Sequence, residues 1–379
     1  MHFSHATPEA TYQFAKRFSH YKDFYMRHDG LIFSKLGFGT FKKEPYKEEN
    51  YTFDYKEALK TALRGGINVI DTAINYRYQE SERDIGSVLQ ELFARGECKR
   101  EELILCSKGG FIPLCFPFPE NPYMWIEEHI LQKELASVDE IELDQHCMSP
   151  AFLEDSLHRS LENLHVETID IYFLHNPETQ LTKIGYETFL KKLEGIFELF
   201  EAKVKEGKIK AYGIAVWNAF TYEPSNPEYI SIEDVYDVAC RVGGANHHFK
   251  YLQLPFNIAK TNAYSVANQK MSDGCMYTPL HVAHKLGLGV ISSSSLLQMN
   301  LFQKPFKPEV GYVLDKEMIL KSDVDLALQF VRSTRGIITS LFSSSKPEHV
   351  TCNVSIASIN AIKSTQYQLL YQLEKSHDV

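Results

Sequence analysis

Residues 55–93 read YKEALKTALRGGINVIDTAINYRYQESERDIGSVLQELF, and two kinds of spacing alternate within them. In Tyr55–Arg64 the apolar side chains recur at the spacing of one helix face, and two glycines follow as a helix stop. Asn68–Ala73 is a short, β-branched apolar run that favours a buried strand, and Glu82–Phe93 returns to helical spacing. The stretch therefore predicts a helix–strand–helix unit of the kind that builds a parallel sheet.

The same alternation continues along the chain. Eight short apolar runs are separated by longer segments that carry helix signals. We predict strands at Phe33–Thr40, Asn68–Ala73, Leu103–Ser107, Thr168–His175, Lys208–Val216, Tyr251–Phe256, Gly287–Ser294 and Gly336–Phe342. Eight such repeats favour an α/β fold closed into a (β/α)8 TIM barrel. An open, doubly wound sheet is the alternative, although no GxGxxG motif follows an early strand.

Three segments fall outside the repeats. Tyr25–Thr40 predicts an N-terminal β-hairpin with Asp29–Gly30 as its two-residue turn. Residues 1–24 are expected to form an N-terminal extension, of which residues 1–20 are poorly attached. Residues 25–379 are then one barrel domain, with a long loop insertion at about 111–150 after the third strand.

Composition argues against several classes of protein. Of the 379 residues, 44% are hydrophobic and 23% charged, which is typical of a chain with a packed core. A net charge of −9 argues against nucleic-acid binding. No apolar run approaches the roughly 18 residues that cross a bilayer, and the N-terminus lacks the apolar stretch of a secretory signal. Seven scattered cysteines without a CxxC motif suggest reduced thiols. We therefore expect a cytoplasmic protein.

Histidines and cysteines do not form a metal-binding pattern. His146 beside Cys147 and the pair His247–His248 are the nearest approaches to one. Adjacent residues seldom bind one metal ion without further ligands at set spacings, so we predict no metal.

Four reactive side chains are expected at one rim of the barrel. Asp71 and Tyr76 follow the second predicted strand, Lys108 ends the third and His175 ends the fourth. Singly, each could be a cap, a packing residue or a solvated charge. In a closed parallel barrel, however, the carboxyl ends of the strands meet at one face, where barrel enzymes carry their active sites. The four side chains therefore become neighbours.

This combination suits the reduction of a carbonyl or the oxidation of an alcohol. A tyrosine hydroxyl is a sluggish acid, and a nearby ammonium such as that of Lys108 favours the phenolate and lowers the pKa of Tyr76. Asp71 would keep the lysine charged and oriented, and His175 would orient the carbonyl oxygen or share the proton. None of these groups carries a hydride, so a nicotinamide cofactor must supply it.

The chain from about Leu31 to Val354 resembles the aldo-keto reductases. Gly37–Thr40 (GFGT) resembles the first-strand motif of that family, and Asp71–Tyr76 (DTAINY) fits its DxAxxY signature. Lys108 and His175 match the other two of its four active-site positions. The resemblance implies a (β/α)8 barrel, NADP(H) extended across the rim, and the tyrosine as general acid/base.

The resemblance also implies cofactor contacts, several of which are changed here. The usual Ser-Asn after the fifth strand is Ala215–Val216, and the expected aromatic stacking residue on the seventh is Ser293. A lysine and an arginine common in the 2′-phosphate site align with Ser343 and His349. Serines, Lys346 and a helix N-terminus near Pro347 could still receive the phosphate, so NADP(H) is favoured and NAD(H) stays open. The implied contacts are Gly39, Thr40, Gln253, Ser294, Leu296, Gln298, Ser343, Ser344, Lys346, His349 and Asn353.

We therefore predict an oxidoreductase that transfers a hydride between NADP(H) and a small aldehyde, ketone or sugar. The changed cofactor positions leave a second hypothesis, a catalytically weak nucleotide-binding regulatory or partner subunit on the same barrel. The substrate, the reaction direction and the oligomeric state stay open.

The insertion at Phe111–Pro150 is expected to form part of the substrate pocket, because it leaves the third strand directly after Lys108-Gly109-Gly110. The alternative is that it folds down the outside of the barrel or makes a subunit contact. Its expected apolar walls are Phe111, Pro113, Phe116, Phe118, Tyr123 and Trp125.

Overall fold

Eight parallel strands close into a barrel in the computed structural model, which describes residues 4–42, 53–143, 145–315, 317, 319–320, 322–363, 365–367 and 369–370. The strands follow one another around the barrel in chain order, and the last pairs with the first. They are β3 (Leu36–Gly39), β4 (Val69–Asp71), β5 (Ile104–Gly109), β8 (Ile169–His175), β9 (Ile209–Ala215), β10 (Phe249–Pro255), β13 (Gly289–Ser293) and β14 (Ile337–Phe342). The eight predicted strands and the (β/α)8 fold are confirmed.

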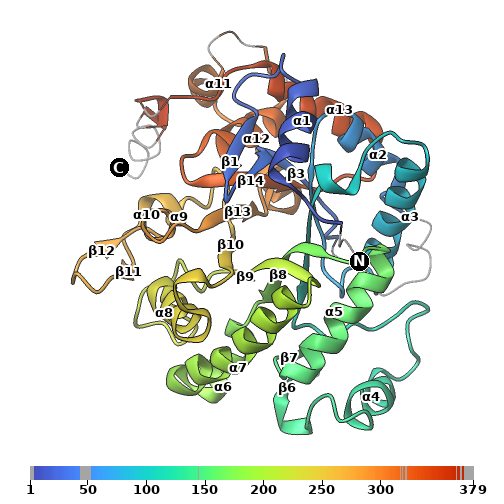
Figure 1. Cartoon of the computed structure of the whole chain (residues 1–379). Coiled ribbons are helices and arrows are strands. Elements are labelled where there is room, and N and C mark those ends of the chain that lie inside the picture. The colour runs from blue at the N-terminus through green and yellow to red at the C-terminus, as the bar shows by residue number, and fades with distance from the viewer. Residues whose placement is uncertain are drawn as a thin grey trace.

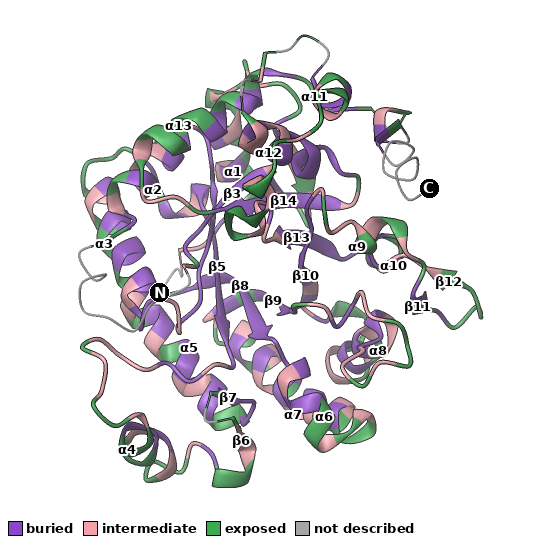
Figure 2. Cartoon of the chain, turned by 180° about the vertical axis from the view of Figure 1, so that it is seen from behind, coloured by how far each residue is buried: buried purple, intermediate pink, exposed green. Residues whose placement is uncertain are grey.

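Helices surround the barrel (Figure 1). The longer ones are α2 (Lys56–Arg64), α3 (Glu80–Ala94), α5 (Pro150–Leu164), α7 (Tyr186–Lys205), α8 (Ile232–Gly243), α12 (Asp323–Ser333) and α13 (Pro347–Ser355). Shorter helices are α6 (Glu178–Ile184), α9 (Asn262–Ser265), α10 (Pro279–Lys285) and α11 (Pro308–Leu314). Figure 2 shows buried residues along the strands and exposed residues on the outer faces of the helices. Within the described residues, no helix combines the length and apolar character needed to cross a membrane.

Helix α2 shows how a sequence pattern produces packing. The apolar face of α2 buries Ala58, Leu59, Ala62 and Leu63. The chain then turns at Gly66, whose φ of +94° lies in the left-handed region that favours glycine. The predicted helix and its glycine stop are therefore both present.

The N-terminal hairpin packs against the barrel strands, because Phe33 lies in one hydrophobic cluster with strand residues such as Val69 and Ile104. Strands β1 (Tyr25–His28) and β2 (Leu31–Ser34) pair antiparallel. The turn residues Asp29 and Gly30 have φ of 45° and 80°, as a tight hairpin turn of the primed type requires. The predicted hairpin is confirmed.

Residues 4–20 are attached to the barrel, so the expectation of a poorly attached segment is wrong for them. They contain helix α1 (Pro8–Arg17), whose Phe14 is buried in the hydrophobic core. Before the helix, the backbone nitrogen of Ala6 donates to Asp170 Oδ1 at 2.7 Å. A main-chain contact of this kind leaves no trace in apolar periodicity, which is why the sequence did not indicate it.

Asp170 also holds a buried arginine at this end of the barrel. Its Oδ2 accepts from Arg100 Nη2 at 2.7 Å and from the backbone nitrogen of Leu105 at 2.8 Å. Arg100 donates further to the main-chain oxygens of Leu103 and Thr168. This cluster therefore joins β5, β8 and the N-terminal segment.

The insertion folds mostly outside the barrel. It contains α4 (Pro122–Ile126), a turn of π-helix at Glu127–Leu131, and a small hairpin of β6 (Ile141–Glu142) and β7 (His146–Cys147). Both views place α4 away from the barrel strands (Figures 1 and 2). The Tyr123 side chain is 65% exposed. Of the six residues expected to form apolar walls, only Phe111 lines the cavity described below, so the prediction was wrong for the other five.

Candidate active site

A cavity of about 1050 Å³ lies at the carboxyl ends of the barrel strands. Residues at or just beyond the ends of β3, β4, β8, β9, β10, β13 and β14 line it, together with Phe111 and Gln145 of the insertion. The volume exceeds the range of about 300–1,000 Å³ that is typical of small-ligand sites. It therefore leaves room for a cofactor and a substrate side by side.

The structure brings the four predicted reactive side chains together at this cavity. Asp71, Tyr76 and His175 line it, and Lys108 is fully buried next to them. Lys108 Nζ lies 2.6 Å from Asp71 Oδ1 and donates to the main-chain oxygen of Thr72 at 2.7 Å. The same Nζ is 5.1 Å from the centre of the Tyr76 ring, and the rings of Tyr76 and His175 meet edge to face at 5.9 Å. A buried ammonium thus stands next to a hydroxyl that faces the cavity.

Desolvation decides the protonation of Tyr76 in the protein alone. Burial raises the pKa of Tyr76 above its ordinary value, and the charge and hydrogen bond of Lys108 oppose that rise without cancelling it. Lys108 therefore lowers the pKa of Tyr76, as expected, but burial, which the sequence could not show, raises it by more. The hydroxyl keeps its proton at neutral pH, which is the state that donates.

The two side chains next to Tyr76, Lys108 and His175, differ in protonation state. Burial by itself lowers the pKa of Lys108, but Asp71 and Tyr76 outweigh it and the pKa of Lys108 is raised, so the ammonium persists. Burial, with the nearby charge of Lys108, holds the pKa of His175 well below its ordinary value. The imidazole of His175 is therefore neutral at physiological pH.

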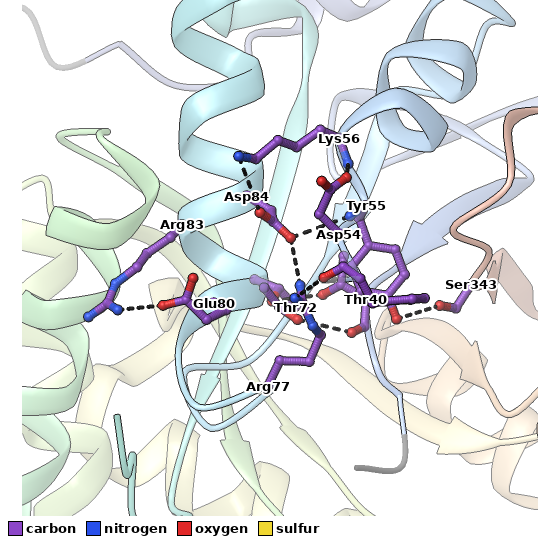
Figure 3. A network of polar contacts seen from close by, with 12 residues as sticks. Thr40, Asp54, Tyr55, Lys56, Thr72, Arg77, Glu80, Arg83, Asp84 and Ser343 are labelled. Carbon is purple, nitrogen blue, oxygen red and sulfur yellow. Dashed lines mark hydrogen bonds and ion pairs between the residues drawn. The ribbon is translucent and has the colours of Figure 1, made fainter. Parts of the chain in front are cut away.

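The loop that carries Tyr76 is held by a buried ion pair. Arg77, Tyr78 and Gln79 all have positive φ, a conformation that costs energy in residues other than glycine. Arg77 Nη1 donates to Asp84 Oδ2 of α3 at 2.6 Å, and its other nitrogen donates to the main-chain oxygen of Phe53 (Figure 3). These contacts fix the loop and thereby the position of Tyr76. Sequence reasoning missed Arg77. The sequence gives little indication of its role beyond an acidic residue, Asp84, seven positions later.

Most of the expected cofactor residues line the cavity. The nine that do are Gly39, Gln253, Ser294, Leu296, Gln298, Ser343, Ser344, Lys346 and His349. Thr40 and Asn353 are both buried and are not among the lining residues, so the structure does not support them as contacts. Thr40 instead donates to Thr72 Oγ1 at 2.9 Å. The amide nitrogen of Gln253 donates one of its two hydrogens to Asp71 Oδ2 at 2.8 Å, which leaves the amide oxygen and the second N–H for a ligand.

One end of the cavity has the features of a phosphate site. Ser343, Ser344 and Lys346 precede α13, and His349 lies in its first turn. Ser343 Oγ donates to the hydroxyl of Tyr55 at 3.1 Å, which ties this loop to the N-terminal end of α2 (Figure 3). A helix N-terminus presents free backbone N–H groups and a positive dipole end to an anion. The four side chains and the helix therefore favour a phosphate group here.

Trp217 is a cavity residue that sequence reasoning did not assign. It is 44% exposed, although both of its nitrogens are bound. Its backbone nitrogen donates to Glu178 Oε1 at 2.7 Å, and its indole Nε1 lies 2.9 Å from the Asn176 amide, in the orientation in which that amide accepts. Asn176 also lines the cavity. Their positions in the sequence could have indicated both residues. Asn176 directly follows His175 at the end of β8, and Trp217 follows Val216 just beyond the end of β9.

Glu178 is a buried carboxyl whose titration links folding to pH. Burial raises its pKa from an ordinary 4.5 to about 7, partly offset by the hydrogen bond from Trp217. The unfolded chain therefore loses this proton at lower pH than the folded one. The contribution of protonated Glu178 to the free energy of unfolding is fully present below about pH 4.5 and is lost as the pH rises through about 7.

We expect Glu178→Gln to remove this pH dependence. The rise from 4.5 to about 7 corresponds to about 3 kcal/mol. The free energy of unfolding of the wild type, relative to the glutamine variant, should fall by about that amount between about pH 4.5 and about pH 8. Urea denaturation across this range measures it, and parallel pH profiles of the two proteins would contradict the prediction.

The described residues contain no group of three or more His, Cys, Asp or Glu side chains that could hold a metal ion.

Known proteins share both the sequence family and the fold. The model of the Aldo/keto reductase family matches residues 35–272. Aldo-keto reductase family 1 member D1 of Rattus norvegicus is 26% identical over 201 residues, which cover 50% of this chain and 48% of that protein. Glycerol 2-dehydrogenase (NADP(+)) of Hypocrea jecorina is 25% identical over 207 residues, which cover 51% of this chain and 52% of that protein. The chain thus spans about half the length of the curated relatives it matches.

Solved structures resemble nearly the whole chain. An aldo/keto reductase from Klebsiella pneumoniae, in complex with NADP and acetate, has a TM-score of 0.59 at 18% identity, with 93% of this chain and 95% of that chain covered. The glycerol dehydrogenase of Gluconobacter oxydans has a TM-score of 0.61 at 18% identity, with 94% of this chain and 96% of that chain covered. At this identity the likeness shows the fold.

Proposed function

The chain belongs to the aldo/keto reductase family, and from that premise we propose that it is an NADP(H)-dependent oxidoreductase acting on a small aldehyde, ketone or sugar. One observation carries the proposal: the buried ammonium of Lys108 lies beside Tyr76, which lines the cavity. Its Nζ is 2.6 Å from Asp71 Oδ1. The relative named glycerol 2-dehydrogenase (NADP(+)) and the solved complex with NADP support the cofactor and the substrate class.

In this proposal Tyr76 holds the proton that the carbonyl oxygen receives. The raised pKa of Tyr76 keeps the hydroxyl protonated until the substrate arrives. When the proton leaves, the ammonium of Lys108 stabilises the phenolate, and Asp71 keeps that ammonium charged. Neutral His175 orients the carbonyl oxygen by hydrogen bonding. Oxidation of an alcohol is the same sequence in reverse.

The residues present fit an NADP(H) molecule, which would supply or accept the hydride. Lys346, His349 and the N-terminal turn of α13 would hold the phosphate of the adenosine, and the amide oxygen of Gln253 would meet the carboxamide. Trp217 would offer an aromatic surface for stacking on the nicotinamide ring, which Ser293 cannot provide. We include a cytoplasmic location in the proposal, because all seven cysteines are unpaired thiols.

Loss of NADPH absorbance over a panel of aldehydes, ketones and sugars tests this function. We expect turnover with at least one class of carbonyl compound, and none when NADPH is omitted. The alternative of a regulatory nucleotide-binding subunit requires tight NADPH binding without turnover on any member of the panel. That result would replace the proposed function by the alternative.

The preference for NADPH over NADH should be modest. His349 stands where the resemblance places an arginine, whose guanidinium is always charged and can bind a phosphate through two parallel hydrogen bonds. We expect the ratio of the NADH to the NADPH dissociation constant to be only a few-fold in the wild type and to rise in His349→Arg. Fluorescence titration of both cofactors measures it. A large ratio in the wild type would assign the phosphate to Lys346 instead.

A further inference from the structure

The return strand of the insertion places a second histidine against the end of β8. His146 in β7 is fully buried, and its Nε2 lies 2.7 Å from the main-chain oxygen of His175. Because a carbonyl oxygen only accepts, Nε2 must carry the hydrogen. Among the described residues Nδ1 has no hydrogen-bond partner. The contact therefore fixes the tautomer of His146.

This carbonyl needs a side-chain donor because β5 leaves the barrel too early to supply one. The last pair between β5 and β8 is Gly109 with Leu174. At Gly110 the chain turns out into the insertion with a φ of +143°, and a Cβ there would lie 2.8 Å from the oxygen of His175 and 2.9 Å from His146 Nε2. The oxygen of His175 thus lies beyond the last pair of the β5–β8 ladder, and a buried carbonyl without a donor is costly.

Two further contacts hold β7 in this place. The backbone nitrogen of Cys147 donates to the oxygen of Gly110 at 2.7 Å. Phe111 forms a β-bridge with His146, and its ring lies 5.1 Å from the ring of His146 and 4.9 Å from that of His175. The two ends of the insertion therefore contact both the main chain and the ring of His175.

The contact does not depend on pH in the neutral range. Burial lowers the pKa of His146 to about 4, so the ring is uncharged at neutral pH and keeps its single N–H. His146 is also absent from the residues that line the cavity, so it does not meet a ligand directly. Its effect must pass through its neighbours, Phe111 and His175, and its hydrogen bond goes to His175.

We propose that His146 is a positioning residue for His175, so that the insertion acts on the active site through this contact as well as through the lining residues Phe111 and Gln145. The role of His175 itself rests on the proposed function. A displaced catalytic group can lower a rate by as much as 10²-fold even when all the reacting groups are present. Loss of the Nε2–H donor should therefore slow the reaction without weakening cofactor binding.

The test compares His146→Phe, which keeps a ring but no donor, with His146→Gln, whose amide keeps a donor at similar reach. We expect His146→Phe to lower kcat for carbonyl reduction about tenfold, with KM and the NADPH dissociation constant within about twofold of wild type. His146→Gln should recover most of the loss. His247→Phe is the matched control, because His247 is also buried but pairs with Tyr236, and it should leave kcat unchanged.

A measurement without turnover separates this proposal from the proposed function. In NMR spectra of protein labelled at histidine, the His175 signals are identified by their loss in His175→Gln. We expect them to shift and broaden in His146→Phe and to stay close to wild type in His146→Gln. Unchanged His175 signals in His146→Phe, or equal kcat values for His146→Phe and wild type, would overturn the positioning role. A wild type without turnover on any carbonyl would overturn the proposed function, and the NMR result would then decide the role of His146.

Discussion

Replacing Tyr76 with phenylalanine is expected to lower the rate of carbonyl reduction by about 10² or more. The substitution removes only the hydroxyl that holds the transferred proton. The ring contacts with Phe41 at 5.2 Å and with His175 at 5.9 Å can persist, so the cavity keeps its shape. Single-turnover oxidation of bound NADPH measures the effect on chemistry, and a titration should show NADPH affinity within a few-fold of wild type.

Tyr123→Phe is the control for this experiment. It removes a hydroxyl from an exposed residue of the insertion, outside the cavity, and should leave the single-turnover rate unchanged. A Tyr76→Phe variant that retains nearly the full rate would exclude Tyr76 as the proton donor, and the family assignment would then need another group in that role.

The second large effect is expected on stability, at the opposite end of the barrel. Asp170→Ala removes the partner of buried Arg100 and the acceptor of two backbone nitrogens, those of Ala6 and Leu105. Breaking a buried ion pair by removing one partner leaves an uncompensated charge and typically costs about 3–5 kcal/mol. We therefore expect the free energy of unfolding in urea to fall by at least about 3 kcal/mol.

The chain offers a matched surface pair as the control. Asp155 and Arg159 of α5 also lie 2.6 Å apart, but both side chains are partly exposed. Surface pairs of this kind contribute about 0–1 kcal/mol, so Asp155→Ala should have a small effect. Equal losses of stability in the two variants would show that burial of the Asp170 pair is not what matters.

The sequence could predict the barrel and the meeting of Asp71, Tyr76, Lys108 and His175, because both follow from strand periodicity. Parallel strands place their carboxyl ends at one face, and each of these residues stands at or shortly after such an end. The hairpin was equally accessible, since Asp29–Gly30 is a local turn signal.

Other features depend on contacts between distant segments, which periodicity does not encode. The pKa of Tyr76 is raised because desolvation outweighs the charge of Lys108, and the degree of burial is known only from the three-dimensional structure. The contact of His146 with the main chain of His175 joins residues 29 positions apart through a side-chain nitrogen. The middle of the insertion is as aromatic as its start, so composition could not show that Phe111 is the one of its six expected wall residues that reaches the cavity.

The pairing of β14 with β3 determines when this protein can complete its folding during synthesis. Strand β3 lies near the start of the chain, whereas β14 ends at Phe342 of 379 residues. Until that strand has left the ribosome, the nascent chain presents two open edges, at β3 and β13, to which other chains can pair. A chain that ends before Ile337 therefore cannot close the barrel, and we expect it to aggregate rather than to show weak activity.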